Sequence, residues 1–500
     1  MFDLLEQIKN SSIETILDNN RAQNKEENDQ YFTPVETAIY MSGMFKEFKK
    51  KELYILDPGC GFGNLSIILI ANILTKQNKP KKIYLDLYDS DPTVLEKLKE
   101  NISALEDICS LVNVELNCNI FLEDFLVSGI NIVNSKNKSY DCIILNPPYR
   151  KLKNNSAHKK ILMENKINVP NYYAAFLAIS YRLLSEKGQV VAIIPRSFCS
   201  GTYFKDFRND MIKHTKIERI HIFKSRKSLF YDEVVQETLI ISLSKKNQKL
   251  NDKIQITESI KTDFSNIKNT YKRFDNVIFP TDKEKIIRII HTNDKEIVDR
   301  MHQLPCDIEE LGISVSTGPI VDFREEKRNL SFKYKVGSNP LIYLENFKNG
   351  FINHPIPINK PSFIIEDETN KKRLKPSGMY VLVKRFTTQE EKKRIVAGIF
   401  DNTSEPSQKV GFDNKLNYFH ENCQGIRDKK IVQGLWLYLN SSVVDQYFRT
   451  YSGNTQVNVS DLKNFRYPTR KQLKEIGETI KEKDVLSQDE IDEIILRVCY

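Results

Sequence analysis

Short apolar runs alternate with segments of helical periodicity from Leu53 to about Lys246, and this alternation constrains the fold more than any other feature. The apolar runs read LYILD, IYLDLYD, CIILN, QVVAIIP and TLIISLS, and the helical pattern after the first of them reads NLSIILIANIL. β-Branched runs of about four to eight residues predict strands that are buried on both faces. Their alternation with helices predicts a doubly wound α/β sheet, which binds its ligands at the carboxyl ends of its strands.

The length of the chain indicates more than one domain, because 500 residues exceed what a single hydrophobic core usually organises. The alternating pattern ends near residue 250, and the residues up to about 300 are rich in lysine and asparagine. We therefore predict an α/β domain over 1–250, an interdomain connection over 251–305 and a second domain over 306–500. Short strands and polar loops give the second domain α+β character, and the capping box from Ser487 to Glu490 predicts a final helix.

Composition excludes several classes of protein. The chain has no uncharged apolar run of about 18 residues and no basic leader before an apolar stretch, so we expect a cytoplasmic protein without membrane contact. The eight cysteines include no pair at CxxC spacing and the seven histidines show no ligand spacing, which predicts neither a metal site nor a disulfide framework. The net charge of +9 suits a polyanionic partner.

The loop LDPGCGFGN directly follows the first predicted strand. Gly59, Gly61 and Gly63 allow a tight turn and a close approach of the backbone to a ligand, and the next helix presents its amino-terminal dipole. The spacing is GxGxG after Asp57 and differs from the GxGxxG of dinucleotide-binding loops. An acidic residue before the glycines suits a cationic, amino-acid-bearing ligand better than a pyrophosphate.

Acidic residues also end the next two predicted strands. IYLDLYDSDP ends in Asp89 and Asp91, and a carboxylate at this position can accept both hydroxyls of a ribose. NIFLEDFL ends in Glu123, Asp124 and Phe125, where a polar acceptor beside a ring could read an adenine edge. Each signal alone is weak, but in this order they describe a pocket for S-adenosylmethionine.

A fourth strand ends in the tetrapeptide Asn146-Pro147-Pro148-Tyr149. Each proline fixes φ and lacks a backbone donor, so the pair stiffens the chain just beyond the sheet and leaves its carbonyls free to accept hydrogen bonds. The Asn146 side-chain oxygen and the Pro147 carbonyl can each accept one hydrogen from a planar amino group. Such an arrangement would aim the nitrogen lone pair at a methyl donor.

With these features in this order, the chain resembles the gamma-class, TaqI-like adenine-N6 DNA methyltransferases. The stretches that carry the resemblance are QYFTP (30–34), DPGCGFG, Asp89, EDF (123–125), NPPY, NYYAAFL (171–177) and SLFYDEVVQETLIISL (228–243). Beyond residue 310 the likeness narrows to the PstI and BsuBI type of modification enzyme, through SVSTGPIVDFR, YVLVKRFTTQEEKKRIVA and SGNTQVNVSDL. One departure is Asp89, which stands where glutamate is common in the family.

The resemblance implies a Rossmann-like S-adenosylmethionine-dependent methyltransferase domain and a DNA target-recognition domain. It implies transfer of a methyl group to the N6 amino group of an adenine flipped out of duplex DNA, in a type II restriction-modification system with a paired endonuclease. The implied cofactor-binding set is Tyr31, Thr33, Pro34, Asp57, Gly59, Gly61, Gly63, Asp89, Asp124, Phe125 and Asn146. The implied catalytic set is Asn146, Pro147, Pro148, Tyr149 and Phe230, in which the two rings sandwich the base. We expect a monomer, and CTGCAG as the recognition sequence if the likeness extends to base contacts.

Positive charge concentrates between Lys371 and Arg394, where nine basic residues accompany two acidic ones. The apolar strand MYVLV interrupts this run, and a helix is expected to follow it. We therefore expect DNA contacts from Lys384, Arg385, Lys392, Lys393 and Arg394. The alternative is a solvated face without a partner.

Four other functions are alternatives to DNA methylation. NPPY also occurs in protein-glutamine methyltransferases, and an RNA methyltransferase could use the same site, but about 250 residues and a basic segment follow the first domain and favour DNA. A DNA-binding module with an inactive methyltransferase fold is disfavoured because Asp57, Asp89, Asp124 and NPPY are all present. A fused nuclease would need spaced acids and a lysine, and Asp322, Glu325 and Lys327 are too closely spaced for it.

Overall fold

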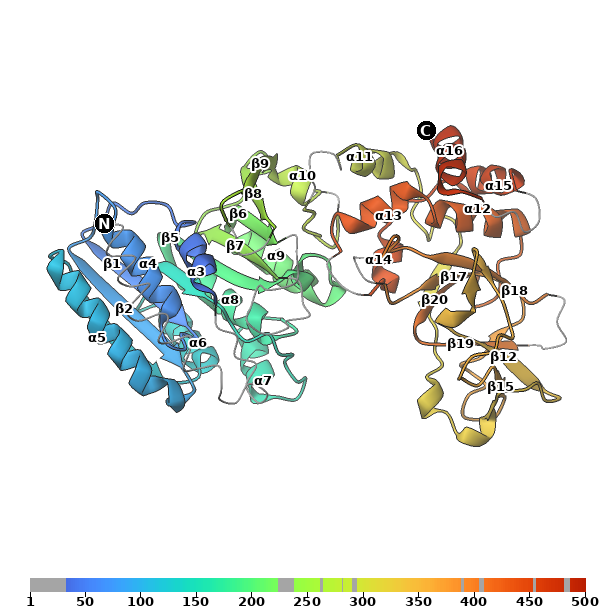
Figure 1. Cartoon of the computed structure of the whole chain (residues 1–500), viewed down its shortest axis with the longest axis horizontal. Coiled ribbons are helices and arrows are strands. Elements are labelled where there is room, and N and C mark those ends of the chain that lie inside the picture. The colour runs from blue at the N-terminus through green and yellow to red at the C-terminus, as the bar shows by residue number, and fades with distance from the viewer. Residues whose placement is uncertain are drawn as a thin grey trace. The chain divides into compact units, whose positions relative to one another are not determined.

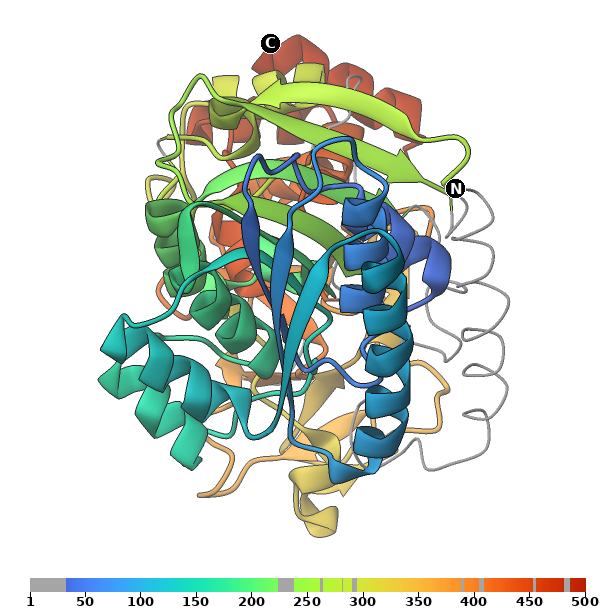
Figure 2. The ribbon, with the colours of Figure 1, turned by 90° about the vertical axis from the view of Figure 1, so that its left-hand side faces the viewer.

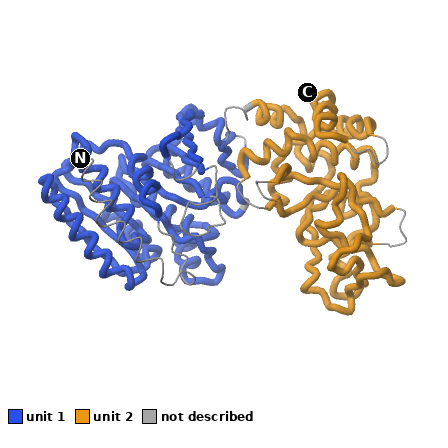
Figure 3. The backbone as a smooth tube through the Cα atoms, in the orientation of Figure 1, with its two compact units in different colours: residues 1–289 blue, residues 290–500 orange. Residues whose placement is uncertain are grey.

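The computed structural model describes residues 33–223, 238–260, 264–280, 282–289, 295–387, 391–403, 409–452, 456–480 and 486–500. The chain divides into two compact units, residues 1–289 and residues 290–500 (Figure 3). The boundary falls inside the stretch 251–305, in which we expected an interdomain connection.

A nine-stranded sheet organises the first unit, and its strand order is β3-β2-β1-β4-β5-β7-β6-β8-β9. The strands are β1 (Glu52–Pro58), β2 (Lys82–Asp89), β3 (Glu115–Leu122), β4 (Tyr140–Leu145), β5 (Leu184–Pro195), β6 (Lys216–Phe223), β7 (Thr238–Ser244), β8 (Lys253–Ser259) and β9 (Lys268–Arg273). Strands β1 to β5 pair in parallel, whereas β7 lies antiparallel between β5 and β6. The strand order reverses between β1 and β4, which creates a topological switch point there.

Helices cover both faces of this sheet, as Figures 1 and 2 show. In one group α4 packs against both α3 and α5, and in a second α8 packs against both α6 and α9. The helices are α3 (Val35–Ser42), α4 (Asn64–Leu74), α5 (Leu95–Leu111), α6 (Phe125–Ser135), α7 (Ala157–Glu164), α8 (Tyr172–Arg182), α9 (Lys205–His214) and α10 (Phe274–Val277). Strands β4 and β7 are buried along their whole lengths, because both of their faces lie under helices.

The predicted doubly wound α/β fold of this unit is confirmed. Each apolar run quoted above forms a strand, and NLSIILIANIL forms α4 over the same residues. The predicted connection over 251–305 is wrong in its first part, because residues 253–259 and 268–273 form β8 and β9 at the edge of the sheet. These two strands were not predicted because their sequences are polar. The strand β9 reads KNTYKR and is largely exposed, which is possible because an edge strand can have one solvated face.

The second unit combines two small sheets with helices. One sheet has the order β10-β20-β17-β18-β14-β13 and the other β11-β15-β12-β19-β16. The strands are β10 (Ser314–Thr317), β11 (Leu330–Ser331), β12 (Ser338–Ile342), β13 (Phe347–Lys348), β14 (Phe351–Ile352), β15 (Phe363–Ile365), β16 (Lys375–Pro376), β17 (Met379–Lys384), β18 (Ala397–Asp401), β19 (Lys409–Phe412) and β20 (Leu416–His420). The helices are α11 (Lys295–Gln303), α12 (Lys429–Leu439), α13 (Ser442–Arg449), α14 (Val459–Lys463), α15 (Arg470–Glu478) and α16 (Gln488–Cys499).

Helices α12 and α15 approach each other unusually closely, and two glycines make this possible. A Cβ atom on Gly434 would lie 1.8 Å from the Leu473 carbonyl oxygen, and one on Gly477 would lie 1.9 Å from the Lys430 carbonyl oxygen. The final helix, α16, begins with the capping box predicted from the sequence, in which the Ser487 and Glu490 side chains each accept the other residue's backbone N–H. The short strands and helices agree with the predicted α+β character of this part of the chain.

Candidate active site

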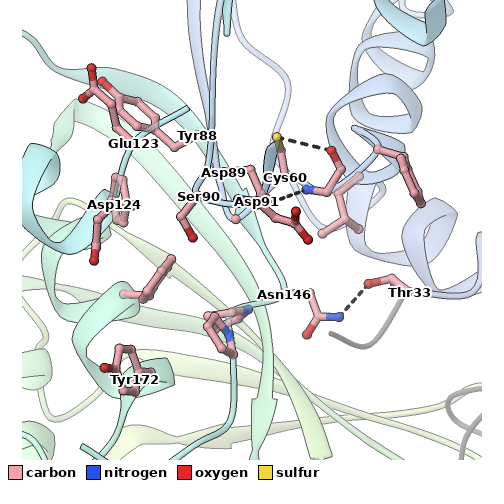
Figure 4. A pocket seen from close by; sticks show the side chains of 18 of the residues that line it. Thr33, Cys60, Tyr88, Asp89, Ser90, Asp91, Glu123, Asp124, Asn146 and Tyr172 are labelled. Atoms are coloured by element: carbon pink, nitrogen blue, oxygen red, sulfur yellow. Dashed lines mark hydrogen bonds between the residues drawn. The ribbon is translucent and has the colours of Figure 1, made fainter. Parts of the chain in front are cut away.

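A cavity of about 360 Å³ lies where the carboxyl ends of β1 to β4 meet (Figure 4). This is the edge at which the loops after β1, β2, β3 and β4 converge, beside the switch point between β1 and β4. The following residues of the predicted set line it: Thr33, Gly59, Gly61, Asp89, Asp124, Phe125, Asn146, Pro147 and Pro148. The fold thus brings together groups that lie more than 100 residues apart in the sequence.

The glycine loop forms one wall of the cavity. Gly59, Gly61 and Gly63 have φ values of 77°, 53° and 80°, in the left-handed region that glycine adopts without steric cost. The backbone N–H groups of Gly59 and Cys60 donate to the Tyr88 carbonyl oxygen at 2.7 and 2.9 Å, which ties the loop to the end of β2. Gly63 does not line the cavity; it precedes the first residue of α4 and sets the direction of that helix.

Asp57 lies behind this loop and is completely buried. Within the described part of the chain, neither of its carboxylate oxygens has a hydrogen-bond partner of ordinary geometry. Burial raises the pKa of Asp57 to about 7, Ser66 offsets part of this rise, and the neighbouring Asp89 adds to it. A buried carboxyl group without a strong donor is suited to stabilising a cation that binds beside the loop.

Asp89 is placed at the end of β2 with its carboxylate toward the cavity. One oxygen accepts the Gly61 N–H at 2.8 Å, and the other accepts the Asp91 N–H at 2.9 Å. Burial raises the pKa of Asp89, and these backbone N–H groups partly offset the rise. Each oxygen can accept a further hydrogen bond, so a diol remains a suitable ligand. Asp91 itself caps the turn that follows by accepting from the Thr93 N–H at 2.9 Å.

Asp124 and Phe125 occupy the turn between β3 and α6. Asp124 caps α6 by accepting the Leu126 N–H at 2.9 Å, and its other oxygen lies 2.6 Å from His158 Nε2. Phe125 is buried against Phe176, with 5.3 Å between the ring centroids. An acceptor therefore stands beside an aromatic wall, as the sequence led us to expect.

The tetrapeptide after β4 is held by hydrogen bonds on both sides of the Asn146 amide. Its Nδ2 donates to Thr33 Oγ1 at 3.1 Å, a contact drawn in Figure 4, and its Oδ1 accepts from the Tyr149 hydroxyl at 3.0 Å. Pro147 and Pro148 line the cavity, whereas the Tyr149 ring is buried and lies edge-on to Tyr173. Tyr149 thus orients the amide oxygen in this structure, a contact that the motif alone did not indicate.

The predicted cofactor-binding and catalytic sets also include Tyr31, Pro34 and Phe230. Tyr31 and Phe230 lie outside the described residues. Pro34 is buried and immediately precedes α3, beside Thr33 and away from the cavity lining.

The structure adds lining residues that the sequence did not single out. Arg150 and Tyr172 are the most informative, because the Arg150 guanidinium lies over the Tyr172 ring at 4.3 Å from its centroid. His158 stands behind them, with Nδ1 at 2.8 Å from the Tyr172 hydroxyl oxygen. Arg150 directly follows NPPY and Tyr172 lies in the quoted NYYAAFL stretch, so proximity to these motifs was the available signal. No periodicity or spacing pointed to His158.

The five basic residues expected to contact DNA are in different environments. Lys384 is half-buried, with its ammonium 5.4 Å from the Phe347 ring centroid, and Lys392 is exposed. Arg385 donates to the Asn414 carbonyl oxygen at 3.1 Å, and Lys393 to the Asn440 carbonyl oxygen at 2.7 Å.

The expectation for Arg394 is wrong for the structure as it stands, because its side chain is completely buried and its guanidinium lies against Phe448. The expected helix is also absent from residues 391–396, which form bends before β18. Arg394 Nε donates to Thr387 Oγ1 at 3.1 Å, so this arginine fills a core position in place of a groove-facing one.

The described residues also bear on the metal, disulfide and nuclease alternatives. No group of three or more histidine, cysteine or acidic side chains there could hold a metal ion, and all eight cysteines are free. Glu325, considered above for a nuclease, is buried and paired with Arg373. No helix in the described ranges is both long and apolar enough to cross a bilayer.

Comparison with known proteins agrees with this geometry. Residues 45–230 match the family model of the Eco57I restriction-modification methylases. The chain is 38% identical to the type II methyltransferase M.BsuBI of Bacillus subtilis over 94% of its own length and 93% of the relative. It is 35% identical to the type II methyltransferase M.PstI of Providencia stuartii over 93% and 92% of the two chains.

Solved structures share the fold at low sequence identity. A nuclease-deletion mutant of the Type ISP restriction-modification enzyme LlaGI superposes with a TM-score of 0.52, at 13% identity, over 93% of this chain and 56% of that one. The Type IIL restriction-modification enzyme MmeI gives a TM-score of 0.52 at 11% identity, over 93% and 70% of the two chains. The similarity to M.BsuBI and M.PstI is the stronger finding, because it covers nearly the whole of each sequence. The chain therefore belongs to the family of type II restriction-modification methyltransferases that includes M.BsuBI and M.PstI.

Proposed function

We propose that the protein transfers a methyl group from S-adenosylmethionine to the N6 amino group of an adenine flipped out of duplex DNA, as the modification enzyme of a type II restriction-modification system. The observation that carries this proposal is the single cavity edge at which Asp89, Asp124 and Asn146-Pro147 meet. Three strand ends there offer hydrogen-bond acceptors suited to the ribose of the cofactor, the adenine of the cofactor and the amino group of the target adenine. The similarity to type II methyltransferases over more than nine-tenths of the chain supports DNA as the substrate.

The chemistry of the lining fits S-adenosylmethionine. Asp89 retains acceptor capacity for the ribose hydroxyls, and Asp124 beside the buried Phe125 suits the adenine. The turn of Gly59 and Gly61 leaves the cavity wall without side chains at the point where the amino-acid end would lie, with Asp57 behind it. When bound, this cofactor supplies an electrophilic methyl group on a sulfonium.

Asn146 and Pro147 would prepare the target nitrogen. The lone pair of an adenine amino nitrogen is delocalised into the ring, which makes the nitrogen a poor nucleophile. The Asn146 Oδ1 and the Pro147 carbonyl oxygen would each accept one amino hydrogen and draw the nitrogen toward tetrahedral geometry. The Thr33 and Tyr149 contacts hold the Asn146 amide in one orientation before the base arrives. No covalent intermediate and no side-chain base are needed, because the acceptors act by position and charge, and the methylated nitrogen would then release its extra proton to solvent.

The target base must leave the duplex to reach this cavity, at a cost of about a few kcal/mol. By the family pattern, Tyr149 and Phe230 would stack on the extruded adenine, which is worth about 1 to 3 kcal/mol for each aromatic contact. The buried position of Tyr149 means that its ring would have to become accessible when the base enters. We propose this rearrangement as part of base capture.

We further propose that residues 290–500 recognise the target sequence and residues 1–289 carry out the chemistry. Lys384 and Lys392 retain exposed surface and are the candidates for phosphate contacts, with Arg385 as a candidate for base reading. Lys393 donates to the Asn440 carbonyl oxygen and Arg394 is completely buried, so both are left out of this set. Arg385 stays in it because its guanidinium has several donors besides the one bound to the Asn414 carbonyl oxygen. A paired endonuclease, a bacterial cytoplasmic location and a monomeric state belong to the same proposal.

A protein-glutamine or RNA substrate is not favoured, because the similarity to type II methyltransferases extends through the second unit as well as the first. The experiment that tests the proposal is sequencing of genomic DNA from cells that express the protein, with detection of modified adenines. We expect N6-methyladenine at one short palindrome, with CTGCAG as the first candidate. Methylation confined to cytosine would refute the proposed target atom and leave the family membership intact.

A further inference from the structure

We propose that His158 is a positioning residue for recognition of the cofactor's adenine, through its hydrogen bond to Asp124. This inference rests on the proposed function, because it assumes that S-adenosylmethionine occupies the cavity. His158 lies on α7, outside every motif that carries the family resemblance, and it does not line the cavity itself. It would act through Asp124, which does line the cavity.

The Asp124 carboxylate is fixed by donors from two different elements. One oxygen accepts the Leu126 N–H at 2.9 Å within its own helix cap, and the other lies 2.6 Å from His158 Nε2. The cap alone would leave the carboxylate free to turn about its bond to Cβ, because a single hydrogen bond does not define a plane. With His158 in place both oxygens are held, and the lone pairs that remain have fixed directions.

The second ring nitrogen of His158 is held as well. Nδ1 lies 2.8 Å from the Tyr172 hydroxyl oxygen, and the two rings meet edge-on at 5.5 Å between centroids. An imidazole that donates from Nε2 to the carboxylate can accept at Nδ1 from the tyrosine hydroxyl, so both ring nitrogens have a partner. The side chains of Asp124 and His158 are 40% and 25% exposed, which leaves the pair partly shielded from water.

The chain of contacts continues to the catalytic tetrapeptide. The Tyr172 ring lies under the Arg150 guanidinium, and the Tyr172 N–H donates to the Arg150 carbonyl oxygen at 3.0 Å. Arg150 is the residue after NPPY. His158 therefore links the acceptor at the end of β3 to the loop that carries the catalytic amide. Figure 4 shows the two cavity-lining members that flank it, Asp124 and Tyr172, on the same side of the pocket.

A pair of ligands that differ only at the adenine amino group tests this role. The exocyclic amine of adenine donates a hydrogen bond, whereas unsubstituted purine carries only a hydrogen at the same position. We expect the wild-type protein to bind S-adenosylhomocysteine more tightly than its analogue in which unsubstituted purine replaces adenine. In His158→Ala, we expect affinity for the adenine ligand to fall about tenfold and the preference between the two ligands to shrink by a similar factor.

Three further variants separate positioning from general packing. His158→Gln can donate to Asp124 and accept from Tyr172, so it should restore most of the preference. Tyr172→Phe removes one hydroxyl and should give a smaller loss than His158→Ala. The matched control is His214→Ala, because His214 is a helical histidine of 32% exposure whose Nδ1 lies 3.3 Å from an aspartate oxygen, that of Asp210, away from the cavity. It should leave both affinities unchanged.

Each outcome of the calorimetric titrations is decisive. Failure of the wild type to bind S-adenosylhomocysteine would refute the proposed function itself. Binding without preference for adenine would leave the cofactor site in place and overturn the role of Asp124, and that of His158 with it. A wild-type preference that survives unchanged in both His158→Ala and Tyr172→Phe would overturn the positioning role alone. Should His158→Ala not fold, by circular dichroism, the glutamine and phenylalanine variants still give the test.

Discussion

Replacing Asp57 by asparagine should stabilise the protein without cofactor, and by an amount that depends on pH. Asp57 is completely buried, and its pKa in the folded protein is about 7 against an ordinary value of 3.8. At about 1.4 kcal/mol for each tenfold change in proton affinity, the ionised form destabilises the fold by roughly 4 kcal/mol above pH 7. Asparagine has nearly the same shape and carries no charge.

The sign of the pH dependence follows from the raised pKa. The folded protein holds this proton more tightly than the unfolded chain, so the contribution of Asp57 to stability is greatest below about pH 4. It declines as the pH rises and levels off above about pH 7. Between pH 5.5 and pH 8 the wild type should therefore lose about 2 kcal/mol relative to Asp57→Asn.

Urea unfolding at the two pH values measures this difference, and any pH-independent effect of the substitution cancels from it. Circular dichroism should follow the transition, because the single tryptophan, Trp436, lies in α12 of the second unit and does not report on Asp57. A free energy difference between the two proteins that is the same at both pH values would refute the reasoning. It would mean that Asp57 is already ionised and compensated within the fold.

Further predictions concern other parts of the structure. Asp89→Ala should weaken S-adenosylmethionine binding by about 1.5 to 3 kcal/mol in calorimetry, and unchanged affinity would exclude Asp89 as the ribose acceptor. Tyr149→Phe removes the donor to Asn146 Oδ1 and should lower kcat about fivefold with little change in the KM for cofactor, in steady-state methylation assays. Gly434→Ala should lower the free energy of unfolding of the second unit by about 1 to 3 kcal/mol, because the new methyl group would overlap the Leu473 carbonyl oxygen. Unfolding followed by Trp436 fluorescence measures this loss. Gly43→Ala, whose Cβ would lie at an ordinary 3.4 Å from its nearest neighbour, is the control, with its unfolding followed by circular dichroism because Gly43 lies in the first unit. Lys392→Gln should weaken binding to all duplexes alike and reduce the salt slope by about 0.9 if it loses one phosphate contact.

The sequence was sufficient for the central architecture because the inner parallel strands β1, β2, β4 and β5 are largely buried on both faces. Such strands must be almost wholly apolar, so β1, β4 and β5 are visible as apolar runs. The edge strand β9 was not predicted, because a strand with one solvated face does not need to be apolar on that face. The misassigned connection over 251–305 has the same cause.

The sequence predicted those site residues whose polar side chains directly follow a strand. Asp89, Asp124 and Asn146 each directly follow a strand, so the parallel topology alone brings them to one edge. The buried state of Arg394 could not be foreseen, because a basic run in sequence carries no information on which side chains face the core. His158 was missed for a related reason: its contact with Asp124 joins residues 34 positions apart that no shared element positions.

The central claim is that this cavity directs a methyl group to adenine N6, and the most direct measurement is the chemical identity of the methylated nucleoside. Purified protein is incubated with methyl-labelled S-adenosylmethionine and duplex DNA, which is then digested to nucleosides and separated by mass spectrometry. We predict that the label appears as N6-methyldeoxyadenosine, and that Asn146→Ala abolishes it while still binding S-adenosylhomocysteine and DNA. Label on cytosine, or more than a few per cent of wild-type turnover in Asn146→Ala, would contradict the account.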